Sequence, residues 1–342
     1  MKLVFFGTPQ FAVPSLERLA AHGDFQVAAI VSQPDRRRGR GGKVTPSPVK
    51  AAGLKVGCPI WQPERIKRDP ETLQRLHQLQ ADAFVVVAYG QILSPEILAM
   101  PSLGCINAHG SILPDYRGAA PIQWSLYHGE TVTGVTTMQM DAGMDTGPML
   151  LKETLPIGIF DNAREIADRL SRLSAELLIN TLLKLKAQLI RPVPQEDAKA
   201  SYAPLIQKAD YLINWQRSAL EIHNQVRGFY PSCVTQCREQ PLKVQATLPL
   251  IDAIWGQLPP EWAPLQAAYL QQISAGEAFI EPSRAQASRP GTLMGVIKNY
   301  GPVVATGSGH LLLRTVQPAG KKAQSGWDFA NGNRLVTGET LG

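Results

Sequence analysis

Apolar runs of strand length alternate with segments of helical period in the first part of the chain. The runs at 2–6, 26–32 and 83–90 have the length of strands, whereas 15–22 and 71–79 repeat apolar residues every three or four positions. This alternation is typical of β-α-β units around a largely parallel sheet. The sequence therefore predicts an α/β fold for this part of the chain.

The same patterns extend to residue 189. The run at 103–107 is apolar without alternation, as is 83–90, which indicates strands buried on both faces. Asp161 or Asn162 is expected to cap a long amphipathic helix. The further predicted elements are a helix at 121–129, strands at 134–140 and 149–157, and the long helix within 161–189.

The pattern breaks at about 190–204, where proline and charged residues replace any apolar period. We interpret this segment as a linker between two domains, 1–204 and 205–342. The second begins with a helix-like piece at 218–229, followed by short β-rich runs separated by Gly- and Pro-containing turns. These runs predict a small antiparallel β-barrel or sandwich, and 253–290 reads as an insertion in it.

The composition is that of an ordinary globular protein. The 342 residues are 44% hydrophobic and 18% charged, as in an ordinary globular protein, and no stretch is long and apolar enough for a membrane helix. The N-terminus lacks the features of a signal peptide. Four cysteines make neither a disulfide framework nor a four-ligand metal site. We therefore expect a cytoplasmic protein with free thiols, no metal and no membrane partner.

Familiar nucleotide and hydrolase motifs are missing from the sequence. The first turn, "FFGTPQFA", lacks the glycines that let a backbone approach a dinucleotide pyrophosphate, and no phosphate-binding GxxxxGK[ST] loop occurs. Neither HExxH nor GxSxG is present, so zinc protease and serine hydrolase chemistry lose support. The net charge of +6 permits an acidic partner such as nucleic acid without requiring one.

Asn107 and His109 are the first candidates for chemistry. Residues two apart on a strand point to the same face, so both side chains would project where the run 103–107 ends, and ligands bind at the carboxyl ends of such strands. An amide can donate to a carbonyl oxygen that gains negative charge, and an imidazole exchanges protons near neutral pH. The alternative is that both side chains only satisfy local backbone groups.

A Gly-rich turn later in the chain carries two carboxylates, Asp141 and Asp145. An aspartate paired with His109 would orient the imidazole and favour its protonated form. Aspartates in such turns also hydrogen-bond the nearby backbone, which is the alternative interpretation.

These residues carry a resemblance to a known family. "INAHGSILPDYRGAAPIQW" (106–124) followed by "GVTTMQMDAGMDTGPML" (134–150) resembles the folate-dependent formyltransferases, whose mark is Asn-x-His, Ser-Leu-Leu-Pro and then Asp. The match is closest to members that formylate the methionine carried by initiator tRNA. It extends through "FFGTPQFAVPSL", "QPDRRRGRGGKVTPSPVK", "VVVAYGQIL" and, past the linker, "INW" and "IHNQVRGFYP", and so covers most of the chain.

The resemblance implies a fold and an activity. A Rossmann-like formyltransferase domain would precede a small barrel of the oligonucleotide-binding type, and the protein would transfer a formyl group from 10-formyltetrahydrofolate to the α-amino group of methionyl initiator tRNA. The family's catalytic trio falls on Asn107, His109 and Asp145. Its folate-contacting tetrapeptide falls on Ser111, Ile112, Leu113 and Pro114, where Ile112 replaces the commoner Leu, a swap of equal volume. The segment 87–93 would wall the pterin pocket, mainly through its backbone.

The resemblance also gives the basic segment 34–50 a function. Alone, such a run is more often a solvated loop, too polar and broken for a regular element. In the family this loop reaches the acceptor end of the tRNA, and Arg40 matches its most important arginine. Arginines on a glycine-rich loop suit contacts with phosphates and unpaired bases. The barrel would hold the tRNA from the other side through Lys298, Arg314, Lys321 and Lys322.

Two other functions remain open from the sequence. One is a related enzyme reaction that would use the same trio. It would be formyl transfer to a small amine, such as a sugar nucleotide or glycinamide ribonucleotide, or hydrolysis of the formyl group. An inactive RNA-binding homologue would keep the fold without the chemistry. The arginine loop and the second domain argue against the first, and the intact trio argues against the second. We expect a monomer.

Overall fold

The computed structural model describes residues 1–38, 43–271 and 289–342. Its elements group into two compact units. The first comprises 1–122, 132–156 and 165–205, and the second comprises 123–131, 157–164 and 206–342. The expected division into domains at residue 204 stays a prediction.

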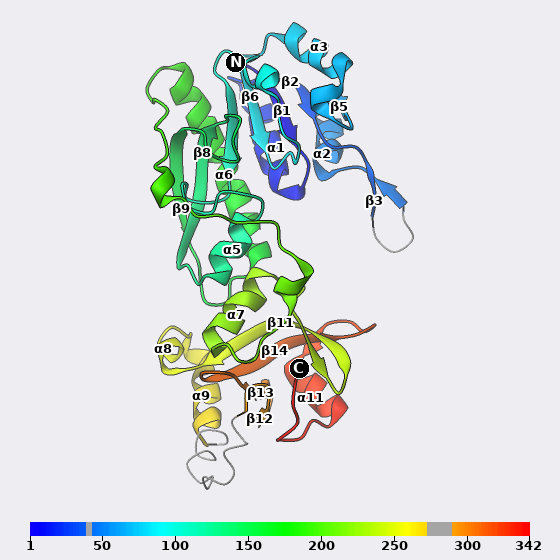
Figure 1. Ribbon diagram of the computed structural model, residues 1–342, viewed down its shortest axis with the longest axis vertical. Coiled ribbons are helices and arrows are strands. Elements are labelled where there is room, and N and C mark those ends of the chain that lie inside the picture. Colours follow the sequence, from blue (N-terminus) through cyan, green and yellow to red (C-terminus); the bar gives the residue numbers. More distant parts are fainter. Residues whose placement is uncertain (39–42, 272–288) are drawn as a thin grey trace. The chain divides into compact units, whose positions relative to one another are not determined.

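A seven-stranded sheet forms the centre of the first unit, in the order β5-β2-β1-β6-β7-β8-β9. Its first five strands run parallel, and β8 and β9 add an antiparallel edge. In Figure 1 the neighbouring strands β1, β2 and β6 run from blue to cyan, and β8 and β9 are green. The predicted α/β class is confirmed. The strands are β1 (Lys2–Gly7), β2 (Gln26–Val31), β5 (Ile60–Trp61), β6 (Ala83–Val87), β7 (Cys105–His109), β8 (Val132–Gln139) and β9 (Met149–Pro156).

Helices of the first half begin where the sequence offers a proline in the first turn or a capping side chain. Ser47, Asp69 and Ser94 each accept a hydrogen bond from a backbone N–H at the start of the following helix. Of the two candidate caps for the long helix, Asn162 accepts from the backbone N–H of Arg164. The helices are α1 (Val13–Ala21), α2 (Pro48–Val56), α3 (Pro70–Leu79), α4 (Pro95–Leu98), α5 (Pro121–Tyr127) and α6 (Ala163–Lys186), with 3-10 turns at Gln10–Ala12, Ile66–Arg68 and Asp197–Lys199.

The apolar runs are buried as their patterning predicts. All five residues of β6 are buried, which explains why that run shows no alternation. Alternate residues of β1, Val4 and Phe6, pack in one cluster with Phe84 and with Leu76 of α3. Burial on both faces fixes the position of each strand end, and the candidate site lies at those ends.

The basic segment contains a regular element that the sequence pattern did not predict. The strands β3 (Arg36–Arg38) and β4 (Lys43–Thr45) pair antiparallel, with Arg36 opposite Thr45. The prediction that this segment is too broken for regular structure was therefore wrong for these residues. A two-stranded ladder needs only backbone hydrogen bonds, and composition is a poor guide to so short a pairing.

The second unit contains a six-stranded antiparallel sheet, in the order β10-β11-β14-β13-β12, with β15 also paired to β14. Residues near the end of the sequence bridge its two edges, because Leu341 pairs with Cys237, the last residue of β10, and Thr340 pairs with Thr292, just before β12. The elements are a 3-10 turn at Lys208–Tyr211, α7 (Ala219–Gly228), β10 (Val234–Cys237), β11 (Gln240–Leu250), β12 (Leu293–Ile297), β13 (Gly301–Ala305), β14 (His310–Pro318), β15 (Gln324–Ser325) and α11 (Gly326–Asn333).

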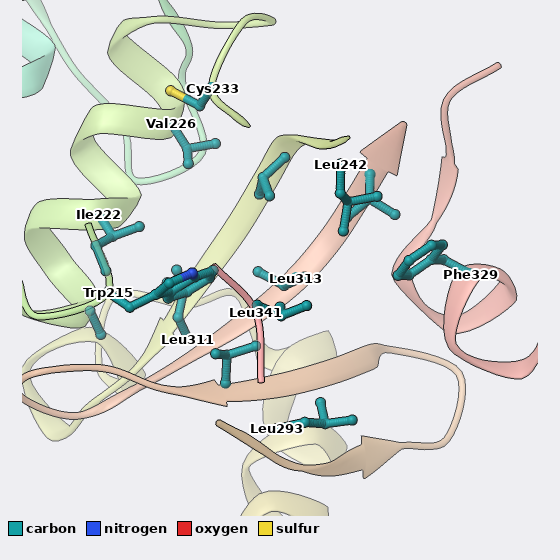
Figure 2. Packing of buried hydrophobic residues seen from close by; sticks show 14 of the residues in the cluster. Trp215, Ile222, Val226, Cys233, Leu242, Leu293, Leu311, Leu313, Phe329 and Leu341 are labelled. Atoms are coloured by element: carbon teal, nitrogen blue, oxygen red, sulfur yellow. The ribbon is translucent and has the colours of Figure 1, made fainter. Parts of the chain in front are cut away.

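Helix α7 covers this sheet. Its residues Ile222 and Val226 and the ring of Trp215 lie over the strand that carries Leu311 and Leu313, as Figure 2 shows. Phe329 of α11 is part of the same buried cluster. Burying side chains of this size contributes about 1.5–3 kcal/mol each, so this cluster is the main apolar support of the unit.

The first part of the predicted insertion adds a second apolar cluster to the sheet. It forms α8 (Asp252–Trp255), a 3-10 turn (Pro260–Trp262) and α9 (Ala263–Tyr269). Leu265 and Tyr269 pack with Leu248 of β11 and Leu312 of β14. The remainder of the insertion, 272–288, lies outside the described residues. No helix among those that the structure describes is long and apolar enough to cross a membrane.

A histidine is enclosed in the second unit. His223 of α7 is 3% exposed, with Nδ1 2.9 Å from the hydroxyl of Thr247 and Nε2 2.9 Å from the carbonyl oxygen of Ile159. Burial, and then the nearby charges of Arg227 and Arg314, lower the pKa of His223 to about 3. The ring is therefore neutral in the folded protein at neutral pH.

This burial predicts a loss of stability in mild acid. The unfolded chain takes up a proton at His223 near pH 6.5, whereas the folded chain does so only near pH 3. The contribution of the neutral ring to the free energy of unfolding is therefore complete above pH 6.5 and is lost as the pH falls from 6.5 towards 3. Between pH 6.5 and 5 we expect a loss of about 2 kcal/mol from this group. His223→Gln should unfold in urea with a correspondingly weaker pH dependence.

The exposed His77 of α3 provides the control, and His77→Gln should keep the wild-type pH dependence. If the free energy of unfolding changed equally with pH in the wild type and in His223→Gln, that result would contradict a neutral buried ring.

Candidate active site

The parallel strands bring their carboxyl ends to one edge of the sheet, where ligands bind in open α/β folds. Asn107 and His109 are the third and fifth residues of β7, on the same face of the strand. On one side Asn107 lies opposite Val86 of β6, and on the other side it lies opposite Met138 of β8. The side chain is partly exposed, and its amide makes no hydrogen bond within the described part of the chain. That amide can donate to an incoming oxygen.

His109 is only 6% exposed, and a polar group lies beside each of its ring nitrogens. Nε2 lies 2.9 Å from the carbonyl oxygen of Tyr116, and because a carbonyl only accepts, Nε2 carries a proton and donates it. Nδ1 lies 3.6 Å from Oδ2 of Asp145, close enough for an ion pair but longer than a hydrogen bond. Catalytic contacts are often long before substrate binds.

The structure distinguishes between the two aspartates of the Gly-rich turn. Asp141 stays within its own turn, where Oδ1 accepts from the backbone N–H of Gly143 at 3.0 Å and from the hydroxyl of Thr146 at 2.7 Å. Asp145 instead lies beside His109, and its Oδ2 also accepts from the backbone N–H of Gly118 at 2.9 Å. His109 and Asp145 are therefore brought together, and Asp141 follows the turn-forming alternative.

The tetrapeptide after β7 is fixed by a threonine of the neighbouring strand. The hydroxyl of Thr136 donates to the carbonyl oxygen of Ser111 at 2.8 Å and accepts from the N–H of Leu113 at 3.0 Å. Ser111 and Leu113 are buried, at 1% and 0% exposure, whereas Ile112 and Pro114 are partly exposed. Side-chain contacts with a ligand are thus left to Ile112 and Pro114.

Two polar residues that the sequence motifs did not single out hold the segment 87–93. The carbonyl oxygen of Tyr89 accepts from the hydroxyl of Thr8 at 2.9 Å and from the side-chain amide of Gln33 at 3.1 Å. Gln33 also donates to the carbonyl oxygen of Gly90. Thr8 directly follows the parallel strand β1, and Gln33 lies two residues after β2, so the strand-end rule that identified Asn107 could have found them.

Five basic residues are expected to bind RNA, and one of them, Arg40, falls outside the described residues. In the second unit Lys298 follows β12, Arg314 belongs to β14, and Lys321 and Lys322 lie in the turn before β15. The guanidinium of Arg314 packs over the rings of Phe160 and Trp262, 4.5 and 4.7 Å from their centroids, and burial lowers its pKa.

A metal site has no support in the part of the chain that is described, because no group of three or more His, Cys, Asp or Glu there could hold an ion. The chemistry available at the strand ends is that of an amide, an imidazole and a carboxylate.

Comparison with known families identifies this arrangement. The model of the formyl transferase family matches residues 1–182, and that of the formyl transferase C-terminal domain matches 205–334. The chain belongs to the formyl transferase family. Among its relatives, the methionyl-tRNA formyltransferase of Synechocystis is 60% identical over 98% of both chains. That of Trichormus variabilis is 59% identical over 100% of this chain and 99% of its own.

Solved structures of other proteins share the fold. The N-formyltransferase of Helicobacter canadensis, in complex with folinic acid and dTDP-3-aminofucose, aligns with a TM-score of 0.61 at 18% identity over 93% of this chain and 99% of that chain. HypX of Aquifex aeolicus, in complex with tetrahydrofolic acid, aligns with a TM-score of 0.56 at 12% identity over 99% of this chain and 48% of that chain. At such identities the likeness concerns the fold alone.

Proposed function

We propose that the protein transfers the formyl group of 10-formyltetrahydrofolate to the α-amino group of methionine on initiator tRNA. The observation that carries this proposal is the 60% identity, over 98% of both chains, to a relative named methionyl-tRNA formyltransferase. The cluster of Asn107, His109 and Asp145 at the end of β7 supports it, because formyl transfer needs a donor for an oxyanion and a carrier for a proton.

In the proposed reaction the neutral amine attacks the formyl carbon. An α-amino group titrates near pH 8, so a useful fraction is already nucleophilic at neutral pH. The formyl oxygen gains negative charge as the carbon becomes tetrahedral, and the unengaged amide of Asn107 donates to it. His109, oriented by Asp145, shares that stabilisation and carries protons between the amine and N10 of the departing tetrahydrofolate. The C–N bond to N10 then breaks, which leaves formylmethionyl-tRNA and tetrahydrofolate.

Substrate contacts are proposed on the same basis. Ser111, Ile112, Leu113 and Pro114 contact the folate, and Ile112 and Pro114 offer side chains because they are partly exposed. Arg40 and the basic residues of the second unit contact the tRNA. The protein acts in the cytoplasm, as a monomer and without a metal ion.

Asn107→Ala should lower kcat by about 10²–10³, the usual cost of one oxyanion donor. His109→Ala should lower it by about 10²–10⁴, as expected for a lost acid–base group. Both variants should bind initiator tRNA as the wild type does, since neither removes a proposed tRNA contact. Formylation of purified methionyl initiator tRNA and a separate binding assay measure the two effects.

Asn180, exposed on α6, provides the control, and Asn180→Ala should keep full activity. Formylation by Asn107→Ala at the wild-type rate would contradict the oxyanion assignment. Turnover of a small amine by the wild type, with none of methionyl-tRNA, would instead favour the alternative acceptor. No folate turnover at all would favour the inactive homologue.

Arg40→Ala should weaken tRNA-dependent catalysis at least tenfold and leave folate binding unchanged, because a basic loop residue contacts the nucleic acid only. Kinetics at varied tRNA concentration, together with folate titration, measure both effects. Arg68, exposed in the 3-10 turn before α3, provides a matched arginine for the control. An equal loss of folate affinity in Arg40→Ala would overturn the loop assignment.

A further inference from the structure

Residues 193–203, which we call the strap, are hydrogen-bonded to both loops that frame His109. Val193 and Met149 exchange two backbone hydrogen bonds of 2.8 Å. At the other end the N–H of Arg117 donates to the carbonyl oxygen of Ser201 at 2.9 Å, and the N–H of Ala203 donates to that of Arg117 at 2.7 Å. The segment expected to serve as a linker thus ties the turn before β9 to the turn before α5.

Gln195 lies at the centre of the strap and uses both ends of its side chain. Its Nε2 donates to the carbonyl oxygens of Asp145 and Gly147, each at 2.7 Å. Its Oε1 accepts from Nε of Arg117 at 3.0 Å. Both amide hydrogens and the amide oxygen are therefore engaged, which fixes the side chain in one orientation.

Arg117 is the anchor for Gln195. Its side chain is only 2% exposed, and burying a guanidinium is costly unless its N–H groups are paired. One terminal nitrogen reaches Oδ1 of Asp197 at 2.9 Å, and Nε reaches Gln195. Its own backbone is held by the strap, and the next residue, Gly118, donates to Oδ2 of Asp145. Arg117 therefore connects the strap to the carboxylate beside His109.

The turn that carries Asp145 needs such a restraint. In the pairing of β7 with β8, Gln139 lies opposite Ile106, so the chain leaves β8 at the end of β7 away from His109. His109 is four residues from the start of β7, about 13 Å along the strand. The turn at 140–148 must fold back over that distance, and Asp145 adopts a left-handed conformation there, with φ of 56°.

We propose that Gln195, anchored by Arg117, is a positioning residue that keeps Asp145 against His109 and so raises the rate of formyl transfer. The part of this inference that concerns catalysis rests on the proposed function. The part that concerns the position of the turn rests on the geometry alone. Gln195 touches no reacting atom and acts only through the backbone of Asp145 and Gly147. Of the strap residues, Gln195 is thus the one that supports the active site.

Gln195→Met keeps the volume of the side chain and removes its amide. We expect kcat to fall about tenfold or more, with KM for methionyl-tRNA and for 10-formyltetrahydrofolate within about twofold of wild type, because a displaced Asp145 affects the chemistry and not the binding surfaces. In an Asp145→Asn background, Gln195→Met should cause little further loss, because its target is already removed.

The neighbouring residue supplies the control. Glu196→Gln removes an exposed ion pair with Lys199 and should change neither kcat nor KM. Wild-type kcat in Gln195→Met, a rise in KM without a fall in kcat, or an undiminished loss in the Asp145→Asn background would each overturn the proposal. A matching fall in melting temperature for both Gln195→Met and Glu196→Gln, with equal activities, would also overturn it.

Amide hydrogen exchange separates this proposal from the proposed function. Gln195→Met should speed exchange severalfold in the peptide 140–148, and Glu196→Gln should not. This readout does not depend on turnover, so it tests the strap even if the wild type fails to formylate methionyl-tRNA, a result that would contradict the function alone. Unchanged exchange at 140–148 in Gln195→Met would overturn the strap.

Discussion

The approach of the Asp145 carboxylate to the His109 ring is the constraint on which the proposed chemistry depends. The sheet alone does not produce it, because β8 runs antiparallel to β7 and the turn that follows β8 therefore starts at the end of β7 away from His109. The turn returns by folding over the strand, and three side-chain or backbone donors hold it: Gly118 at the carboxylate and the two amide hydrogens of Gln195 at the backbone. Each hydrogen bond from Gln195 contributes about 1 kcal/mol, and the one to the carboxylate contributes about 1.5–3 kcal/mol.

The sheet supplies the rigid half of the site. Because its strands are buried, the positions of Thr8, Gln33 and Asn107 at their ends are fixed, and these polar residues face one edge. Most are already engaged with backbone groups, as Thr8 and Gln33 are with the carbonyl of Tyr89. Asn107 differs, since its amide has no hydrogen-bond partner in the described residues. An unengaged donor on a rigid strand can stabilise charge without rearrangement when substrate arrives.

Much of the fold could be predicted from the sequence, because long apolar runs and helical periods report burial directly. The strands at β1, β6 and β14 follow that pattern, whereas the short pair β3–β4 is held by backbone hydrogen bonds that composition does not encode. For the site, spacing placed Asn107 and His109 on one face but could not choose between Asp141 and Asp145. That choice depends on how the turn folds back, which is a tertiary property.

The strap was the least predictable part. Gln195 lies among prolines and charges, a composition typical of linkers, and its partners are 78 and 50 residues away in the chain. Nothing local distinguishes a glutamine that braces a distant turn from one that faces solvent. Arginine is rarely buried, and the burial of Arg117 in the turn before α5 becomes apparent only from the structure.

Single-turnover formylation of methionyl initiator tRNA by His109→Ala, Asp145→Asn and the double variant tests the central claim most directly. If the carboxylate acts through the imidazole, the double variant should react at about the rate of His109→Ala alone, because the aspartate has nothing left to orient. If the two losses multiply in the double variant, Asp145 acts independently of His109, and its assignment as the residue that orients the imidazole is contradicted.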